Sequence, residues 1–344
     1  MRISADRTDD RYFFTTVGGW GDERFLNRAR PIPFSKKLDK IPRTKFYPLA
    51  EFALFQRVLL AALRHDVLLL FSSRGYLKPE LLATAVIGLL PRFLRPRIIF
   101  YGEMFEPNSG LRRWLERGLM RLANRGVFRF ALHSHAEILV FAQTWHIDPA
   151  KIRATGFFNK HAKPDTVIPH QQRERHIFAG GTSFRNYEPL IAAARLMPNT
   201  DFVICTNRLD DRTDLPPNVR AGLVSPDEYD RLIATAAAVV VPLQQDVHRI
   251  TGMLTYLQAM WMKKPVIVSD TLGAREYIDA QTGLIVDGSP ESYVDAIRFV
   301  TDPAQTAVID AMCQRAHDTV LDQFTVAHHV DKLLAVVDEA FADW

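Results

Sequence analysis

Apolar and polar residues alternate along the chain in blocks that predict strands and helices in turn. In the first half, the continuous apolar run at residues 67–71 is typical of a strand buried in a parallel sheet, and residues 97–101 predict the next strand. Residues 46–63 and 111–129 have the apolar spacing of helices. The remaining elements predicted in this half are strands at 12–17, 130–133 and 151–158 and helices at 80–94 and 135–145.

The second half repeats the alternation more regularly. Its predicted strands are residues 176–179, 201–206, 219–223, 238–241, 265–269 and 283–286, and its predicted helices are 187–196, 226–236, 253–262 and 290–300. Strands that alternate with helices indicate βαβ units, parallel sheets and right-handed crossovers. We therefore expect an α/β fold with two doubly wound Rossmann-like domains facing across a cleft. Ligands of such sheets bind at the carboxyl ends of the strands.

The polar segment 159–175 contains Pro164 and Pro169 and predicts a linker between the two halves. The expected domains are residues 1–165 and 166–325, followed by a last segment, 326–344. A chain of 344 residues is long enough for two such cores.

Composition argues against a disulfide-stabilised, zinc-binding, secreted or membrane-spanning protein. Cys205 and Cys313 are the only cysteines and form no C-x-x-C pair, so we expect neither a disulfide framework nor a zinc site. The first twenty residues are polar and charged, which predicts no secretory signal. The longest apolar runs reach only about ten residues, whereas a membrane span needs roughly 20. These features predict a cytoplasmic protein.

Charge divides the chain into a basic and an acidic half. Residues 1–170 hold 28 Lys and Arg against 15 Asp and Glu, whereas residues 171–344 hold 15 against 24. A basic half suggests an anionic partner such as a lipid headgroup, a phosphorylated acceptor or a nucleic acid. We expect no nucleic acid, because the basic residues lack interleaved aromatic residues and no recognition module is visible.

The most informative stretch for chemistry is 238–278. A buried strand leads into a polar loop, and Gly252 then opens a predicted helix at Met253. A helix that starts at the pair Thr251-Gly252 offers unpaired backbone N–H groups and the positive end of its dipole, which suits a diphosphate. An ordinary capped helix would have the same appearance.

The residues of this stretch also carry a family resemblance. The run T-Y-L-Q-A-M-W-M-K-K-P-V-I-V-S-D at 255–270 resembles the signature of the retaining GT-B glycosyltransferases called family 4. The stretches G-A-R-E-Y-I at 273–278 and T-G-L-I-V at 282–286 are similar to that group's next motifs, and D-P-A-K-I at 148–152 resembles the end of its N-terminal domain. The resemblance covers roughly residues 130–300.

The resemblance implies a nucleotide-diphosphate sugar as donor, an acceptor hydroxyl, and transfer with retention. It implies a C-terminal domain that binds the donor, an N-terminal domain that binds the acceptor, and a last helix that crosses back to the N-terminal domain. It implies no cofactor and no metal. The product class would be a polysaccharide, a glycolipid or a glycosylated metabolite.

The chain departs from the family at its two motif glutamates. Gln258 stands in the place of the second, which accepts hydrogen bonds from the donor ribose, and Ile250 stands in the place of the first. The amide oxygen of Gln258 can still accept. For the first glutamate, Gln244, Gln245, Asp246 and His248 of the same loop are candidates. The alternative is a catalytically inactive GT-B partner protein that binds a nucleotide or a glycosyltransferase.

The donor diphosphate also needs a cation, and Arg185 follows the first strand of the second half, where the family has Arg or Lys. A guanidinium can bind phosphate with two parallel hydrogen bonds. The other expected donor-binding residues are Gly18, Gly19, Gly181, Thr206, Leu223, Val224, His248, Thr251, Gly252, Met253, Leu254 and Gln258.

In the first half, Gly18-Gly19 follow the first strand, where small residues let a ligand approach the backbone. Glu103 follows the strand at 97–101, near the place of a family histidine, and is the expected catalytic carboxylate that orients or deprotonates the acceptor hydroxyl. Glu106 is the second candidate. His65 and the pair His328-His329 are expected at surface or capping positions.

Arginines recur at every fourth position on the predicted helix 111–129 and form one stripe, with Leu111, Leu115, Leu119 and Leu122 expected to face the core. The stripe consists of Arg113, Arg117, Arg121, Arg125 and Arg129. It is either a solvated face or a contact with anionic lipid on the inner face of the plasma membrane, which would suit a lipid-linked acceptor. A nucleotide-dependent oxidoreductase is disfavoured, because no G-x-G-x-x-G follows any predicted strand.

Overall fold

The computed structural model describes residues 11–32, 47–71, 78–102, 106–162 and 176–342. The chain divides into two compact units. Residues 1–156 and 329–344 form the first unit, and residues 157–328 form the second. Glu103 lies outside the described residues.

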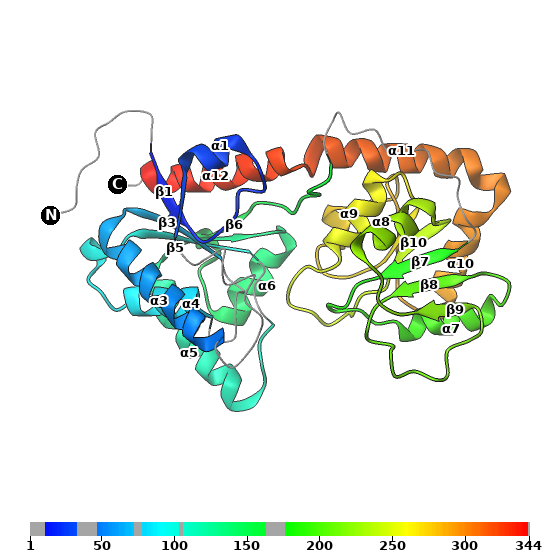
Figure 1. The fold of residues 1–344 in the computed structure, drawn as a ribbon, viewed down its shortest axis with the longest axis horizontal. Helices are drawn as coiled ribbons and strands as arrows, with labels where there is room; N and C mark the ends of the chain where they lie inside the picture. The colour runs from blue at the N-terminus through cyan, green and yellow to red at the C-terminus, as the bar shows by residue number, and fades with distance from the viewer. Residues whose placement is uncertain (1–10, 33–46, 72–77, 103–105, 163–175, 343–344) are drawn as a thin grey trace. The chain divides into compact units, whose positions relative to one another are not determined.

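The first unit is built on a parallel sheet in the order β2-β1-β3-β4-β5-β6 (Figure 1). Its strands are β1 (Phe13–Thr15), β2 (Ala29–Pro31), β3 (Val67–Phe71), β4 (Arg97–Tyr101), β5 (Val127–Leu132) and β6 (Ile152–Ala154). The central strands are apolar on both faces because both faces are covered, and Leu68, Leu69 and Leu70 are fully buried.

Helices cover both faces of this sheet. Figure 1 shows α3 (Tyr47–Arg64), α4 (Pro79–Ile87) and α5 (Gly110–Gly126) on one side, with α1 (Glu23–Arg28) and α12 (Val326–Ala342) on the other. α6 (Ala136–Trp145) joins β5 to β6. Arg24 and Arg28 of α1 form ion pairs with Asp331 and Asp338 of α12, and Arg129 of β5 pairs with Glu339, so ion pairs fasten the last helix to this unit.

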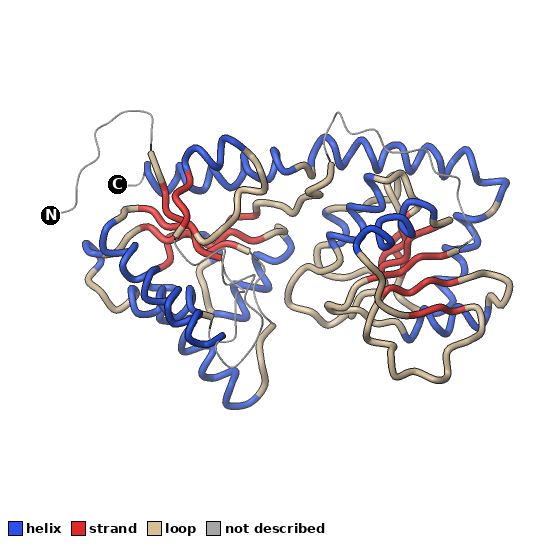
Figure 2. The backbone as a smooth tube through the Cα atoms, in the orientation of Figure 1, coloured by secondary structure: helices blue, strands red, loops and turns tan. Residues whose placement is uncertain are grey.

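The second unit has its own parallel sheet in the order β12-β11-β10-β7-β8-β9. Its strands are drawn in red in Figure 2. Its strands are β7 (Ile177–Gly180), β8 (Phe202–Cys205), β9 (Val219–Ala221), β10 (Ala238–Val241), β11 (Val266–Ser269) and β12 (Leu284–Val286). Its helices are α7 (Glu188–Leu196), α8 (Pro226–Thr235), α9 (Met253–Trp261), α10 (Pro290–Thr301) and α11 (Thr306–Gln323). α8 and α9 pack on one face of the sheet, and α7 and α10 pack on the other.

The predicted alternation of elements is confirmed, but several bounds are wrong. The helix predicted at 80–94 ends at Ile87, and Gly88 after it packs so closely on α5 that a Cβ would come within 2.2 Å of the Leu122 carbonyl oxygen. A 3₁₀ turn, η1 (Arg92–Leu94), follows it, and a second, η2 (Pro149–Lys151), precedes β6. The sequence pattern also missed α1 and β2, which are too short to show a periodicity.

The helix predicted at 111–129 ends three residues early, at Gly126, and Val127 begins β5. The arginine at every fourth position continues to Arg129, so the spacing predicted a helix that is too long. The apolar stripe predicted on this helix is also partly wrong: Leu111 and Leu115 are exposed. Met120 and Ala123 are the buried residues, with Leu119 and Leu122 packed at the edge of the core.

Candidate functional site

The loop that follows β7 holds a buried arginine at the carboxyl edge of the second sheet. Arg185 is only 6% exposed. Its Nε donates to the Gly180 carbonyl at 3.0 Å, one Nη donates to the Ser183 carbonyl at 3.0 Å, and the other donates to Thr255 Oγ1 at 3.2 Å. These bonds fix the guanidinium between the loop after β7 and the first turn of α9.

The three acceptors on Arg185 are neutral, and no ion pair links its guanidinium to a carboxylate within the described part of the chain. Burial lowers the pKa of Arg185, because water no longer solvates the charge. A buried charge without a counter-ion is costly, and a bound anion would remove that cost. Arg185 therefore has the environment of an anion-binding residue.

Tyrosines rather than acidic residues surround this guanidinium. The Tyr187 hydroxyl donates to the Gly181 carbonyl at 2.7 Å, and the Tyr229 hydroxyl lies 3.4 Å from Thr255 Oγ1. Burial raises the pKa of both phenols, so they stay neutral at physiological pH. They provide hydrogen bonds to the loop and leave the positive charge in place.

The loop after β10 runs beside the loop after β7. Asn186 N–H donates to the Pro242 carbonyl, and Gln244 N–H donates to the Phe184 carbonyl, each at 3.0 Å. Beneath this contact, Ser269 Oγ accepts from the Leu243 N–H at 2.8 Å. Backbone hydrogen bonds thus hold the two loops in register at one edge of the sheet.

The start of α9 has the features that the sequence predicted. Gly252 is the N-cap, with φ of +89° and no side chain capping the helix. A Cβ at this position would lie 3.2 Å from Leu243 and Val241, so glycine suits both the conformation and the space. Thr251 is 6% exposed, and its Oγ1 is buried with no hydrogen-bond partner among the described residues. An orphaned hydroxyl beside an uncapped helix start indicates a polar ligand.

The remaining residues that were expected to bind the donor differ in exposure and in the groups that a ligand could reach. Thr206 is fully buried after β8, and its Oγ1 accepts from the Arg208 N–H at 3.2 Å. Leu223 and Leu254 are exposed by 66% and 64%. The Met253 side chain belongs to the core of the unit, so only its backbone can face a ligand. His248 and Val224 are exposed.

The two positions of the missing glutamates are both buried. Ile250 is 1% exposed and packs in the apolar core. Gln258 is 7% exposed, and its Oε1 accepts from Asn159 Nδ2 at 3.1 Å. The same Asn159 Nδ2 donates to the Leu257 carbonyl at 3.1 Å. Sequence reasoning missed Asn159, because it lies 99 residues before its partner in a segment that was predicted to be a linker.

The candidates for the first glutamate's role lie on the loop after β10. Gln245 Nε2 donates to the Asp287 carbonyl at 3.3 Å, which ties this side chain to the loop after β12. Asp246 and His248 are exposed on the same loop, and Gln244 is half-buried. Gln245 is exposed as well, and Asp246 and His248 are the exposed ionisable side chains of this set.

In the first unit, the carboxyl edge of the sheet carries a cluster of aromatic and imidazole rings. The Tyr101 hydroxyl at the end of β4 lies 2.9 Å from His329 Nε2, and His329 Nδ1 lies 2.9 Å from the Gly156 carbonyl. The His133 ring after β5 and the Trp20 ring after β1 pack against this pair. Burial and the neighbouring His133 lower the pKa of His329 to about 3, so its imidazole is neutral.

This ring cluster in the first unit corrects one sequence prediction. His329 was expected at a surface or capping position, but it is 2% exposed. His328 does lie at the helix start, where its Nδ1 is 2.8 Å from Thr325 Oγ1. His65 stacks on Phe14 with 3.3 Å between ring centres. The position of His133 at the end of the predicted strand 130–133 was the available signal for this cluster.

The two glycines after β1 have different environments. A Cβ at Gly19 would come within 2.6 Å of the Phe25 ring, so the packing of α1 explains this glycine without a ligand. A Cβ at Gly18 would meet nothing within 4 Å. Of the two, Gly18 is the position that is open to a ligand.

None of the helices in the described part of the chain has the length and apolar character that a membrane crossing requires. Within the same residues, no three His, Cys, Asp or Glu side chains gather as a metal-binding group. The described acidic residues Asp210 and Asp211, which follow Arg208, thus form no such group.

Residues 178–302 match the family model described as "Glycosyl transferases group 1". Comparison with curated proteins gave no match. Among solved structures, a glycosyltransferase from Rickettsia africae superposes with a TM-score of 0.66 at 15% identity, over 96% of this chain and 99% of that chain. HepE of Anabaena in complex with UDP gives a TM-score of 0.65 at 15% identity, over 96% and 100%.

A sucrose-phosphate synthase from Thermosynechococcus elongatus is similar at a TM-score of 0.61 and 15% identity, over 88% of this chain and 81% of that chain. At such identities the likeness to solved structures establishes the fold alone. The family match assigns residues 178–302 of the second unit to the group 1 glycosyl transferases. The chain accordingly has the GT-B fold, and its second unit contains a domain of the glycosyl transferases group 1 family.

Proposed function

We propose that the chain transfers a sugar from a nucleotide-diphosphate sugar whose diphosphate binds at Arg185 and the start of α9. The observation that carries this proposal is the buried Arg185 guanidinium, which lacks a carboxylate partner among the described residues. The orphaned Thr251 hydroxyl and the uncapped N-terminus of α9 support it. Both neighbouring loops follow strand ends, where this class of sheet binds ligands.

A uridine nucleotide is the donor that the comparisons favour. Two structures of the similar Anabaena HepE contain UDP and UDP-glucose. Exposed Leu223 and Val224 follow β9, where backbone groups could contact the base edge, as the family resemblance implies. Retention of configuration also rests on that resemblance. We assign the role of the missing first glutamate to Asp246 or His248.

Nucleotide binding tests this proposal directly. UDP that binds only the folded chain stabilises it by mass action, by about 2.7 kcal/mol at a hundredfold excess over Kd. The expected order of thermal stabilisation is UDP above UMP above uridine, because each phosphate adds contact with Arg185 and α9. Arg185→Met should remove the advantage of UDP over uridine.

The matched control is Arg298→Met, which removes an exposed arginine from α10. It should keep the wild-type order of stabilisation. Since Arg185→Met deletes three internal hydrogen bonds, Thr251→Val serves as a second variant with a smaller structural effect. A wild-type chain stabilised equally by UDP and uridine would contradict a diphosphate site.

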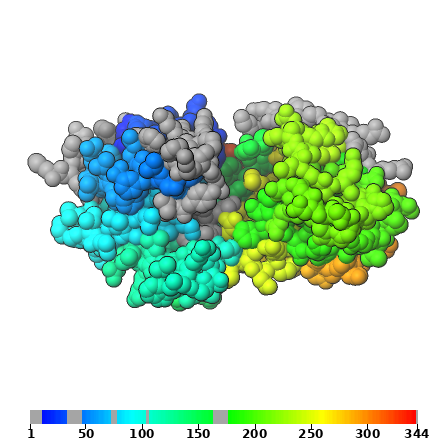
Figure 3. Space-filling view, turned by 60° about the horizontal axis from the view of Figure 1, so that its bottom comes forward, coloured from blue at the N-terminus to red at the C-terminus, as the bar shows by residue number. Residues whose placement is uncertain are grey.

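We also propose an acceptor that is lipid-linked or anionic, with contact between α5 and an anionic membrane surface on the cytoplasmic side. Arg113, Arg121 and Arg125 are exposed on this helix, and Arg117 is half-buried. The exposed Leu111 and Trp114 lie on its first turns. α5 lies at the surface of its unit, in blue-green, in the space-filling view (Figure 3).

Flotation with vesicles tests the membrane contact. Each basic residue near an anionic surface contributes about 1 kcal/mol. The Arg113→Glu, Arg121→Glu double variant should float with phosphatidylglycerol vesicles much less than wild type does. Equal flotation with phosphatidylcholine vesicles would reject the electrostatic contact.

A further inference from the structure

A basic pocket lies at the amino edge of the first sheet, where β4, β5 and β6 begin. It has a volume of about 850 Å³ and is lined by side chains from η1, the end of α5, the first residues of β4 and β5, and η2. This edge is opposite to the one at which the carboxyl ends of these parallel strands carry Tyr101 and His133. The pocket is therefore separate from the site described above.

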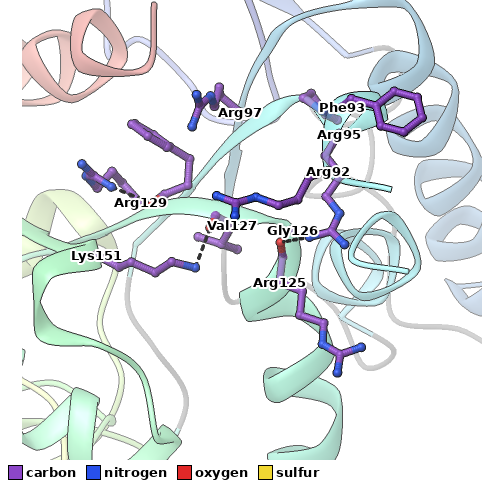
Figure 4. Close-up of a pocket in the computed structure, with 11 residues that line it drawn as sticks. Arg92, Phe93, Arg95, Arg97, Arg125, Gly126, Val127, Arg129 and Lys151 are labelled. Atoms are coloured by element: carbon purple, nitrogen blue, oxygen red, sulfur yellow. Dashed lines mark hydrogen bonds between the residues drawn. The ribbon is translucent and has the colours of Figure 1, made fainter. Parts of the chain in front are cut away.

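The lining of this pocket carries positive charge and no acidic side chain among the described residues. Its cations are Arg92, Arg95, Arg97, Arg125, Arg129 and Lys151. Figure 4 shows Arg92, Arg95, Arg97 and Lys151 gathered around the beginning of β5, next to Val127. A pocket of this size is in the range that holds a small-molecule ligand.

Two of these cations are fixed by neutral oxygen atoms. Lys151 Nζ donates to the Asn124 carbonyl at 2.8 Å and to the Val127 carbonyl at 3.1 Å. Arg95 donates to the Leu90 carbonyl at 2.7 Å and to the Arg125 carbonyl at 2.6 Å. Several of these acceptors are carbonyls at the end of α5, where cations are favourable. Capping positions the two side chains but does not neutralise their charges.

Among the described residues, the side chains of Arg92, Arg125 and Arg129 donate no hydrogen bond to the carbonyls at the end of α5, so capping of that helix does not explain their presence. Arg129 is paired with Glu339, and its Nε donates to that carboxylate at 2.9 Å. Arg92 and Arg125 are exposed, and neither side chain has an ion pair or hydrogen bond to any residue in the described ranges. Burial, together with repulsion from neighbouring arginines, lowers the pKa of both Arg95 and Lys151. An anion in this pocket would relieve that repulsion.

We propose that this pocket binds a phosphate or diphosphate group, carried by a soluble metabolite or by a phospholipid headgroup. Oxyanions accept several charge-assisted hydrogen bonds at once, and Arg and Lys in a concave wall provide the donors. The exposed Phe93 beside Arg92 gives the pocket an apolar rim that an acyl chain or a ring of the ligand could contact. The site is independent of the donor site in the second unit.

Calorimetry with the full chain tests this site, with inorganic pyrophosphate as the probe and saturating UDP present to occupy the donor site. A parallel titration without UDP shows whether pyrophosphate also binds the donor site. We expect Arg92→Glu and Arg125→Glu each to raise the Kd for pyrophosphate at least about tenfold, since a reversed charge replaces attraction with repulsion. Neither side chain holds the fold by a hydrogen bond to a described residue, so both variants should unfold at the wild-type temperature.

The matched control is Arg121→Glu, which makes the same charge change on α5, one turn before Arg125 and outside the pocket lining. It should change the Kd less than about twofold. Equal effects of Arg121→Glu and Arg92→Glu would overturn the proposal, because they would show general attraction to a basic surface. Absence of binding by both pyrophosphate and the lipid probe described next would also overturn it.

A soluble lipid separates the two sources of phosphate. Dihexanoyl phosphatidylglycerol below its micelle concentration is compared with the zwitterionic phosphatidylcholine analogue. Binding of the phosphatidylglycerol that is weakened by Arg92→Glu assigns the pocket to a lipid headgroup. Binding of pyrophosphate without the lipid assigns it to a soluble phosphate compound.

Discussion

Gly181 and Arg185 depend on each other: a Cβ on Gly181 would come within 2.9 Å of an Arg185 Nη atom and 3.1 Å of its Cζ. Gly181 also has a φ of +109°, which L side chains rarely adopt. The glycine thus creates the space in which the buried guanidinium lies. The loop after β7 is shaped around this cation, which fits a site whose ligand is an anion.

This relationship predicts that Gly181→Ala weakens nucleotide binding through displacement of Arg185. We expect the affinity for UDP to fall at least about tenfold, or 1.4 kcal/mol. Backbone strain should lower the free energy of unfolding by about 1–3 kcal/mol. Calorimetry with UDP and chemical denaturation measure the two effects.

Gly110→Ala is a control that introduces backbone strain without displacing the Arg185 side chain. Gly110 has a φ of +57° in the first unit, and a Cβ there would meet nothing within 4 Å. This control should lose stability and keep the wild-type affinity for UDP. If Gly181→Ala also kept that affinity, Arg185 would have no part in diphosphate binding.

Thr251→Val should weaken donor binding without harming the fold. The Thr251 hydroxyl is buried and has no partner within the described residues, so its removal costs no internal hydrogen bond. Replacing an unsatisfied buried polar group by a methyl group of similar size is neutral or stabilising, by up to about 1 kcal/mol. Thermal unfolding without ligand and titration with UDP-glucose give the two readouts.

A suitable control is Thr235→Val, since the Thr235 hydroxyl donates to the Arg231 carbonyl at 3.1 Å within α8. It should change donor affinity little. A Thr251→Val variant that loses more than about 2 kcal/mol of stability would show that the hydroxyl has a structural partner.

Substitutions at the two glycines after β1 should have different effects. Gly19→Ala forces a methyl group to within 2.6 Å of the buried Phe25 ring, and overpacking of this kind costs about 1–3 kcal/mol. Gly18→Ala meets open space and should leave stability within about 0.5 kcal/mol of wild type. Denaturant unfolding of both variants measures this difference.

Gly18→Ala also tests the expected ligand contact. If a substrate approaches the backbone at this position, the variant should raise KM while its unfolding stays unchanged. Wild-type KM values for both donor and acceptor would remove Gly18 from the site.

Much of this fold could be predicted from the sequence, because its central strands are buried on both faces. The strands at 67–71 and 238–241 are runs of apolar residues, the strand at 97–101 is apolar after Arg97, and all three have the predicted bounds. α1 and β2 have six and three residues and take their stability from tertiary contacts, such as the packing of Phe25 on Phe13. Local patterns carry little information about such elements.

The candidate site was predictable where a loop directly follows a strand, and less so where distant segments meet. Arg185 lies in the loop after β7 and Thr251 lies just before α9, and their residue types suit an anion. Asn159 and His329 reach their partners across about 100 and 228 residues of chain, which no local pattern records. The basic pocket was missed for the same reason, because its cations come from three separate segments, at residues 92–97, 125–129 and 151.

The depressed pKa of His329 predicts a pH-dependent stability. Free histidine titrates near 6.5, whereas burial lowers the pKa of His329 to about 3. Between these two values the unfolded chain takes up a proton that the folded chain does not bind. The stability that neutral His329 provides is therefore complete above about pH 6.5 and is lost as the pH falls towards 3, with a slope of up to about 1.4 kcal/mol per pH unit.

His329→Gln should flatten this part of the stability profile, because glutamine can hydrogen-bond to Tyr101 but does not titrate. His328→Gln is the matched control: it changes the adjacent residue, whose ring is half-buried beside Thr325, and should leave the wild-type slope. Urea unfolding at intervals from pH 4 to 7 gives the slopes. Parallel profiles for His329→Gln and wild type would mean that His329 binds its proton equally well in the folded and unfolded chains, and the ring cluster would then be open to water.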